Sequence, residues 1–128
     1  MLSWFAPIHR RLVSEPRRDR LAAVLSALAC GATTVLDVGT GDGIVGAAVA
    51  ELLGARIEGA DAKPNPKAPF PVASLDHEQL PFADASFDVV LLSDVLHHAR
   101  SPDGLLREAL RVAKRSVVVK DHFAFGPW

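Results

Sequence analysis

The chain has 128 residues, of which 49% are hydrophobic and 23% are charged, and these proportions exclude a disordered polypeptide and indicate one globular domain. Its 14 lysine and arginine residues nearly match its 15 aspartate and glutamate residues, so the net charge of -1 creates no overall basic field and we expect no nucleic-acid partner. The lone cysteine, Cys30, excludes an internal disulfide framework and is typical of a reducing compartment, so we expect a cytoplasmic protein.

The first residues of the chain combine apolar and arginine side chains without a long apolar segment, so we predict no signal peptide. The longest uncharged run, residues 21–36, falls short of the roughly 20 apolar residues that a membrane span needs. We divide the chain into an N-terminal arm or lid over residues 1–15 and a main domain over residues 16–128. A packing helix with a solvated arginine face explains the arm best, and contact with a membrane surface is the less favoured alternative.

Helix and strand patterns alternate through the main domain. Apolar residues at helical spacing predict helices after Pro16, Gly43 and Ser101. The apolar positions of the first are Leu21, Val24, Leu25 and Leu28, and the sheet-facing positions of the last are Leu105, Leu106, Ala109, Leu110 and Val112. Runs of β-branched and apolar residues predict strands at 33–39, 55–61, 87–92 and 116–120, with a weak strand around Val72. This alternation predicts an α/β fold with a parallel sheet and right-handed crossovers.

Three glycines at alternate positions follow the first predicted strand, in the run Asp37-Val-Gly39-Thr-Gly41-Asp-Gly43. Because glycine lacks Cβ, such a run lets the backbone turn sharply and bring its N–H groups close to a ligand at the amino end of the next helix. The run also contains the dinucleotide-binding spelling Gly41-x-Gly43-x-x-Gly46, so the glycines leave both a nicotinamide cofactor and S-adenosylmethionine open. A tight turn without any ligand is the third interpretation.

Two aspartates at strand ends narrow this choice. Asp37 interrupts an apolar strand end, where an ionised carboxylate is costly unless amides or a cation satisfy it. A cofactor with an ammonium group and a sulfonium would supply positive charge, whereas a pyrophosphate would be repelled. Alternatively, Asp37 holds its own glycine loop by accepting amide hydrogens. Asp61 ends the second predicted strand, 20 residues after Gly41 (61 − 41 = 20), where a carboxylate accepts both hydroxyls of a ribose or merely opens a surface loop.

These residues, with the segment 75–90 and the run Leu96-His97-His98, resemble the class I S-adenosylmethionine-dependent methyltransferases of the small-molecule, type 11-like kind. The resemblance runs from about Thr33 to Asp121, and the run Asp-x-x-x-Leu-Pro-Phe that begins at Asp76 is its most specific part. It implies a Rossmann-like, doubly wound parallel sheet of about five strands in the order 3-2-1-4-5, with flanking helices.

The resemblance also implies the cofactor S-adenosylmethionine and assigns residues to it. Asp37 and the glycines would face the methionine end, and Asp61 would hold the ribose. Asp76 would accept the adenine amino group, with the His77 amide beside it, and Ser93 would line the pocket near the methyl group. The full predicted cofactor-binding set is Asp37, Gly39, Thr40, Gly41, Gly43, Asp61, Ala62, Asp76, His77 and Ser93.

Two features depart from the family pattern. A short proline-rich loop stands where the family usually has a helix between strands two and three, although Pro71 suits an edge strand. The sequence also ends at Trp128, just after predicted strand five, where the family normally adds two more strands and much of the acceptor pocket. We therefore expect a fragment of a longer enzyme with an exposed strand-five edge, or a homodimer that covers this edge.

Methyl transfer is an in-line displacement at an activated sulfonium carbon, so the protein needs mainly to orient the reactants and exclude water. A general base is required only for an acceptor that loses a proton, and the candidates near strand ends are Asp94, His98 and His122. Adjacent His97 and His98 should point in different directions, so at most one would face the pocket. Asp94, Asp121 and His122 offer oxygen and imidazole donors for a metal, but they form no tight ligand motif and we predict no metal site.

The favoured function is methyl transfer from S-adenosylmethionine to an unidentified small-molecule acceptor. The second interpretation is an NAD(P)-binding oxidoreductase, against which Asp37 and the Leu-Pro-Phe run count. The third is a non-catalytic cofactor-binding or interaction module.

Overall fold

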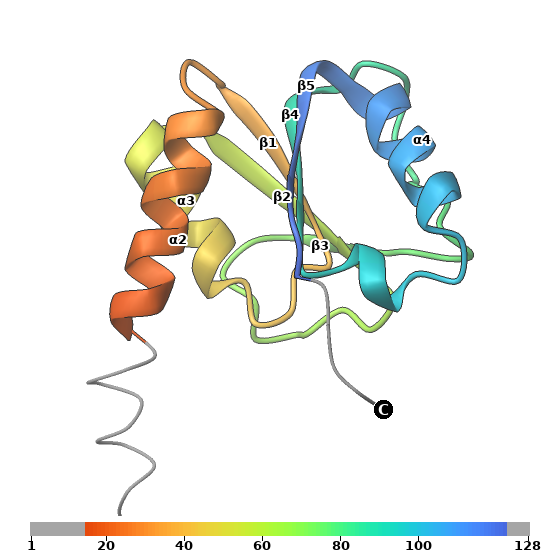
Figure 1. Ribbon diagram of the computed structural model, residues 1–128, viewed down its shortest axis with the longest axis horizontal. Coiled ribbons are helices and arrows are strands. Elements are labelled where there is room, and N and C mark those ends of the chain that lie inside the picture. The colour runs from red at the N-terminus through yellow and green to blue at the C-terminus, as the bar shows by residue number, and fades with distance from the viewer. Residues whose placement is uncertain (1–14, 123–128) are drawn as a thin grey trace, which may run out of the picture.

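The computed structural model of the chain describes residues 15–122, so the predicted arm lies outside the described residues except for Glu15. The described helices and strands are α2 (Glu15–Leu28), β1 (Thr34–Val38), α3 (Ile44–Leu53), β2 (Arg56–Asp61), β3 (Val72–Ser74), β4 (Phe87–Ser93), the short 3-10 helix η2 (Leu96–His98), α4 (Pro102–Val112) and β5 (Ala113–Lys120). The five strands form one sheet in the order β3-β2-β1-β4-β5, and every pairing is parallel (Figure 1). The predicted α/β class and strand order are therefore confirmed.

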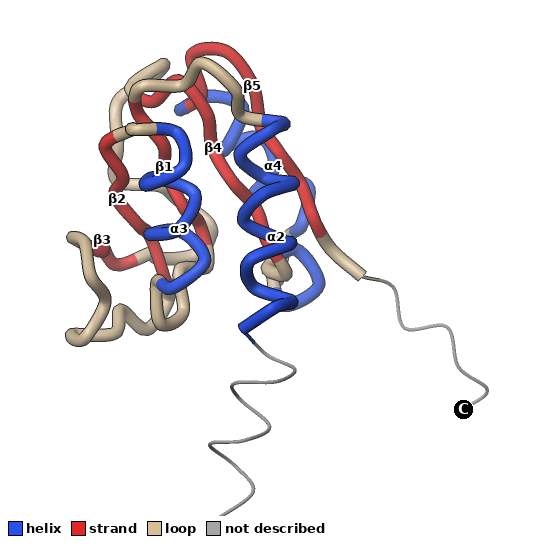
Figure 2. The backbone as a smooth tube through the Cα atoms, turned by 90° about the vertical axis from the view of Figure 1, so that its left-hand side faces the viewer, coloured by secondary structure: helices blue, strands red, loops and turns tan. Residues whose placement is uncertain are grey.

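Helices cover both faces of this sheet. α2 and α3 lie side by side on one face, and α4 lies on the other (Figures 1 and 2). Because side chains alternate along a strand, β1 sends Val35 toward α2 and α3 and sends Leu36 and Val38 toward α4. Each face has its own buried apolar cluster, so the central strands β1 and β4 are apolar on both sides, as buried parallel strands require. None of the described helices has the length and apolar character needed to cross a membrane.

Three predicted core positions prove to be on the surface. Val24 and Leu28 in α2 are 57% and 61% exposed, and Leu110 in α4 is 59% exposed. Other positions in or directly after the same helices, among them the directly adjacent Leu25, Ala29 and Ala109, fill the core instead; the buried residues are Ala22, Leu25, Ala29, Leu105, Ala109 and Val112. Each helix rests on the sheet along a narrow stripe, and the three misassigned residues lie on the flanks of that stripe.

Helix α4 is bounded as the sequence indicates, but it passes into β5 sooner than expected. The Ser101 hydroxyl caps its amino end by accepting the Gly104 N–H at 3.1 Å. Ala113 then adopts an extended conformation directly after the last helical turn, so β5 begins at Ala113 and not at the predicted Ser116. In the described sheet, β5 is an edge strand, and Val119 on it is 46% exposed.

A loop without helical structure joins β2 to β3, as the prolines predict. Its Phe70 ring packs against the places where side chains are missing at Gly43, Gly46 and Gly59. A Cβ at Gly46 would lie 3.0 Å from the ring, and a Cβ at Gly59 would lie 3.1 Å from it. One aromatic side chain therefore covers the glycine turn and the neighbouring strand.

Candidate functional site

Two adjoining pockets lie at the carboxyl ends of β1, β2 and β4. The larger, of about 490 Å³, lies among the end of β2, residues 75–78 and residues 94–100. The smaller, of about 310 Å³, lies among α2, the end of β1 and the glycine turn. Gly39, Gly41 and Asp94 line both. This is the rim at which open α/β sheets bind their ligands.

The turn after β1 depends on glycine at specific positions. Gly39 has a φ of 77° in the left-handed region, and a Cβ there would lie 2.7 Å from Val95 Cγ2. Gly41 also has a positive φ, but a Cβ on it would meet nothing within 4 Å. Gly43 precedes the first turn of α3, and its N–H donates to the Thr40 carbonyl at 3.0 Å. Position 39 thus requires glycine both for its backbone conformation and for the close approach of Val95, whereas position 41 requires it for its backbone conformation alone.

Asp61 ties this turn to the end of β2. Its Oδ2 accepts the Gly41 N–H at 2.9 Å, and its Oδ1 accepts the Lys63 N–H at 2.9 Å. Each carboxylate oxygen keeps a further lone pair for a hydroxyl donor in the larger pocket, which Asp61 lines. The carboxylate that holds the glycine loop is therefore that of Asp61 and not that of Asp37.

Asp37 is a buried acid, only 7% exposed, at the end of β1. Its side chain packs against α3, where a Cβ on Gly46 would lie 2.6 Å from Oδ2. Among residues 15–122, no group donates a hydrogen bond to its carboxylate, and only its backbone carbonyl accepts one, from the Thr40 hydroxyl at 2.8 Å. Burial and, secondarily, the charge of Asp61 raise the pKa of Asp37 to about 7. A cation bound beside Asp37 would stabilise its ionised form and so oppose both causes of the raised pKa.

The segment after β3 forms the outer wall of the larger pocket. Asp76 and His77 line this pocket, and the Asp76 side chain is 87% exposed. His77 and Glu78 have φ values of 47° and 60°, so the backbone here is held in a conformation that L residues rarely adopt. The Glu78 carboxylate accepts the Arg100 N–H at 2.8 Å, which joins this wall to the segment after η2.

Arg111 of α4 anchors the same segment from behind. Its guanidinium donates to the carbonyl oxygens of Leu80 at 3.0 Å and Phe82 at 2.9 Å. Glu108 pairs with this guanidinium and accepts the Leu80 N–H at 2.9 Å. Leu80 is buried and Phe82 packs on the apolar core. The Leu-Pro-Phe run therefore serves to hold the pocket wall on α4.

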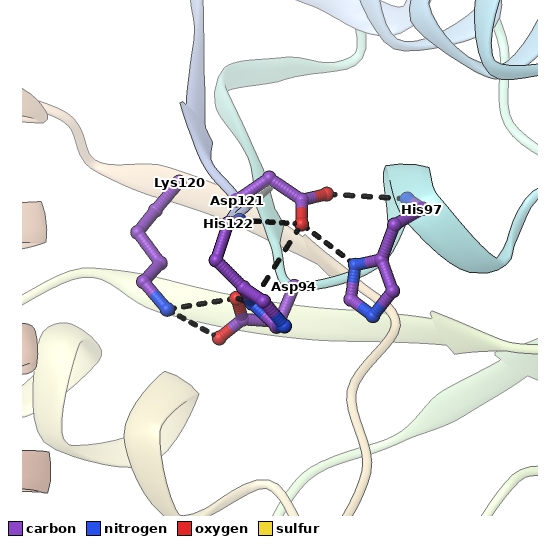
Figure 3. Close-up of polar contacts among 5 residues, drawn as sticks. All are labelled: Asp94, His97, Lys120, Asp121 and His122. Atoms are coloured by element: carbon purple, nitrogen blue, oxygen red, sulfur yellow. Dashed lines mark hydrogen bonds and ion pairs between the residues drawn. The ribbon is translucent and has the colours of Figure 1, made fainter. Parts of the chain in front are cut away.

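Asp94, directly after β4, lines both pockets and is tied to β5. Its φ is 54°, a strained backbone conformation of the kind found at functional sites. Both of its carboxylate oxygens accept a hydrogen bond from Lys120 Nζ at 2.7 Å, and Oδ1 also contacts His122 Nδ1 at 3.0 Å (Figure 3). Partial burial opposes ionisation of Asp94, but the hydrogen bonds from Lys120 and His122 outweigh it and lower the pKa of Asp94. Asp94 therefore remains ionised near neutral pH.

The two adjacent histidines after β4 have different surroundings. His98 lines the larger pocket, whereas His97 Nδ1 contacts Asp121 Oδ1 at 2.6 Å. His122 lines neither pocket and reaches the site only through Asp94.

The predicted cofactor-binding residues gather at this rim with one exception. The larger pocket is lined by Gly39, Gly41, Asp61, Ala62, Asp76 and His77, and the smaller by Asp37, Gly39, Thr40, Gly41 and Ser93. Gly43 lines neither and caps α3 instead. Sequence reasoning did not assign Val95 and Arg100, which also line the larger pocket and carry no motif, or Gly46, whose part in the glycine spelling was the available signal.

The chain is similar in sequence to known methyltransferases. A family model described as a methyltransferase domain matches residues 36–119. An uncharacterized methyltransferase from Mycolicibacterium vanbaalenii is 36% identical over 92 residues, which cover 63% of this chain and 35% of that protein.

Solved structures share the fold. A putative methyltransferase from Bacillus halodurans C-125 superposes with a TM-score of 0.67 at 28% identity, covering 79% of this chain and 50% of that one. A SAM dependent methyltransferase from Aquifex aeolicus superposes with a TM-score of 0.63 at 23% identity, covering 74% of this chain and 61% of that one. The chain thus spans about a third of the curated relative and between half and two thirds of these structures.

Proposed function

Because the chain belongs to the class I S-adenosylmethionine-dependent methyltransferase family, we propose that it binds S-adenosylmethionine across the two pockets and serves methyl transfer to a small-molecule acceptor. The observation that carries this proposal is the buried Asp37 carboxylate, which accepts no hydrogen bond from residues 15–122 and borders the smaller pocket. Such a group favours a cationic ligand and disfavours a pyrophosphate. This preference argues against the nicotinamide alternative.

The residues that would hold the cofactor follow one another along the rim from the smaller pocket to the larger one. Asp37 would face the ammonium and sulfonium end from the smaller pocket. Asp61 would accept the ribose hydroxyls, and Asp76 with His77 would border the adenine in the larger pocket. Ser93 and Asp94 would lie near the methyl group, where the two pockets adjoin.

The bound cofactor would supply a methyl group on a sulfonium, which is already a good electrophile. The chain's own residues would then orient that carbon and exclude water, without a catalytic triad. For an acceptor that loses a proton, His98 is the best placed of the three candidate bases because it lines the larger pocket. Asp94 is a weaker candidate because its lowered pKa makes it a poor base, and His122 contacts Asp94 and not the pocket.

Calorimetry with S-adenosylhomocysteine, S-adenosylmethionine and NADH tests the proposal. We expect both adenosyl compounds to bind and NADH not to bind. Asp61→Asn should weaken S-adenosylhomocysteine binding about 10- to 100-fold, since hydrogen bonds to a charged acceptor contribute about 1.5–3 kcal/mol.

Asp19→Asn is the matched control, because Asp19 is an exposed aspartate on α2 outside both pockets. It should bind like the wild type, and circular dichroism should show that Asp61→Asn remains folded. NADH binding in preference to the adenosyl compounds would refute the assignment. The acceptor would then be sought by following methyl transfer from labelled S-adenosylmethionine to a small-molecule library.

A further inference from the structure

A group of imidazole and carboxylate side chains lies just beyond the pockets, where β4 and β5 end. We call His97, Asp121 and His122 the strand-end triad (Figure 3). His97 Nδ1 lies 2.6 Å from Asp121 Oδ1, and His122 Nδ1 lies 4.0 Å from the same oxygen. The potential ligand atoms of the three residues all lie within 4.8 Å of one another. Only 12% of the Asp121 side chain is exposed, so its carboxylate is fixed between the two imidazoles.

We propose that the strand-end triad binds one divalent first-row metal ion of the Zn²⁺ type. Two imidazoles and one carboxylate form a ligand set that suits Zn²⁺ and its neighbours and leaves coordination positions open. With bonds of about 2.0–2.2 Å, ligand atoms on a common ion lie roughly 4 Å apart or less. The ligand atoms, which lie within 4.8 Å of one another, must move somewhat closer together to meet this condition. His122, whose side chain is 63% exposed, would give up its 3.0 Å contact with Asp94 Oδ1 to do so.

Backbone hydrogen bonds hold the Asp121 carboxylate in place for this role. Oδ1 accepts the His122 N–H at 2.8 Å, and Oδ2 accepts the His97 N–H at 3.3 Å. The site therefore spans two chain segments, one after β4 and one after β5, whose relative position the sheet fixes. Ligands that are positioned before binding lose little conformational freedom when the ion binds.

The nearby charges also favour a cation. Asp94 and Lys120 lie beside the triad, and Lys120 pairs with both oxygens of Asp94. With neutral imidazoles, two carboxylates and one ammonium leave a net charge of -1 (−2 + 1 = −1). Lys120 thus compensates Asp94 and leaves Asp121 as the acid available to the ion. This assignment differs from the sequence-based grouping of Asp94, Asp121 and His122 because His97 takes the place of Asp94.

Titration of the metal-stripped 128-residue chain with Co²⁺ and Zn²⁺, without any adenosyl ligand, tests this site. Visible absorption of bound Co²⁺ and calorimetry with Zn²⁺ should both report one ion per chain. His97→Gln and His122→Gln should each weaken binding at least about 10-fold, since even the loss of groups that only orient metal ligands costs about 10- to 100-fold.

His77→Gln is the control because it removes an exposed histidine that is not one of the triad residues, and it should bind the ion like the wild type. His122→Gln changes an exposed residue, so it remains informative if a variant at the less exposed positions fails to fold. No binding at micromolar concentrations, or equal loss in all three histidine variants, would overturn the proposal. Because the titration involves no S-adenosylmethionine, its outcome is independent of the proposed methyl transfer.

Discussion

The two sides of the pocket rim are built in different ways. On the β1–β2 side, the site is a backbone turn whose shape depends on missing side chains, with Asp61 accepting the N–H of Gly41. On the β4–β5 side, the site is a set of side chains that contact one another across two strands, as Asp94 and Lys120 do. The first side depends on glycines with positive φ, which other residues adopt only with strain, whereas the second is assembled from partly exposed side chains. We therefore expect substitutions on the first side to cost more stability.

The largest effect should come from Gly39→Ala. The left-handed conformation costs an L residue about 1–2 kcal/mol, and crowding against Val95 adds about 1–3 kcal/mol, so we expect a loss of roughly 2–5 kcal/mol. Gly41→Ala is the matched control, because it has the same strain with open space around it, and should lose only about 1–2 kcal/mol. Urea unfolding of the two variants measures both values. Equal losses would show that the contact with Val95 is unimportant.

An intermediate effect is expected from the pH dependence that Asp37 causes. Its pKa is about 7 in the folded chain and ordinarily 3.8, so between these values the folded state keeps a proton that the unfolded chain releases. The stability from Asp37 is therefore full below pH 3.8 and is lost as the pH rises through 7, and it should fall by roughly 2–3 kcal/mol between pH 5 and 8.

Asp37→Asn removes this titration and isolates it, because the variant keeps every histidine of the wild type. Urea unfolding at pH 5, 6, 7 and 8 should show the difference in stability growing in favour of the variant as the pH rises. Asp94 and Asp121 have lowered pKa values, so their contributions are lost only as the pH falls below this window. A difference that stays constant from pH 5 to 8 would contradict the buried-acid interpretation.

The smallest effect should come from the opposite side, with Lys120→Met. The Lys120–Asp94 pair is 40% and 36% exposed, so its removal should cost no more than about 1 kcal/mol. The pKa of Asp94 should nevertheless rise toward its ordinary range, which carbon-detected NMR titration of the Asp94 carboxyl measures. Lys114→Met, at an exposed position on the same strand, should leave that pKa unchanged. A stability loss as large as that of Gly39→Ala would erase the contrast between the two sides.

The same contrast explains what the sequence could predict. The order of strands, the glycine turn and the Leu-Pro-Phe run are local patterns, or patterns shared with a family, and the structure places them as expected. The exposure of Val24 and Leu110 was missed because helical spacing does not say how wide a stripe the sheet covers.

The contacts of His97 were missed for a different reason. Asp121, its partner, lies 24 residues further along the chain, and the pairing depends on the relative placement of β4 and β5. The alternative in which Asp37 holds the glycine loop is wrong, because Asp61 accepts the Gly41 N–H from the neighbouring strand. Contacts between residues that follow different strands produce no regular spacing in the sequence, so they could not be predicted from it.

The loop that carries Phe70 has a consequence for engineering. The Phe70 ring, near the β3 end of the connection between β2 and β3, packs over Gly43, Gly46 and Gly59. This ring anchors that end of the connection. Lys63 and Lys67 are exposed in the same connection, and surface loops of this kind tolerate insertion where the backbone has few buried contacts. A reporter peptide grafted between these lysines would lie near the larger pocket, which Asp61 and Ala62 line, while Phe70 remains in place.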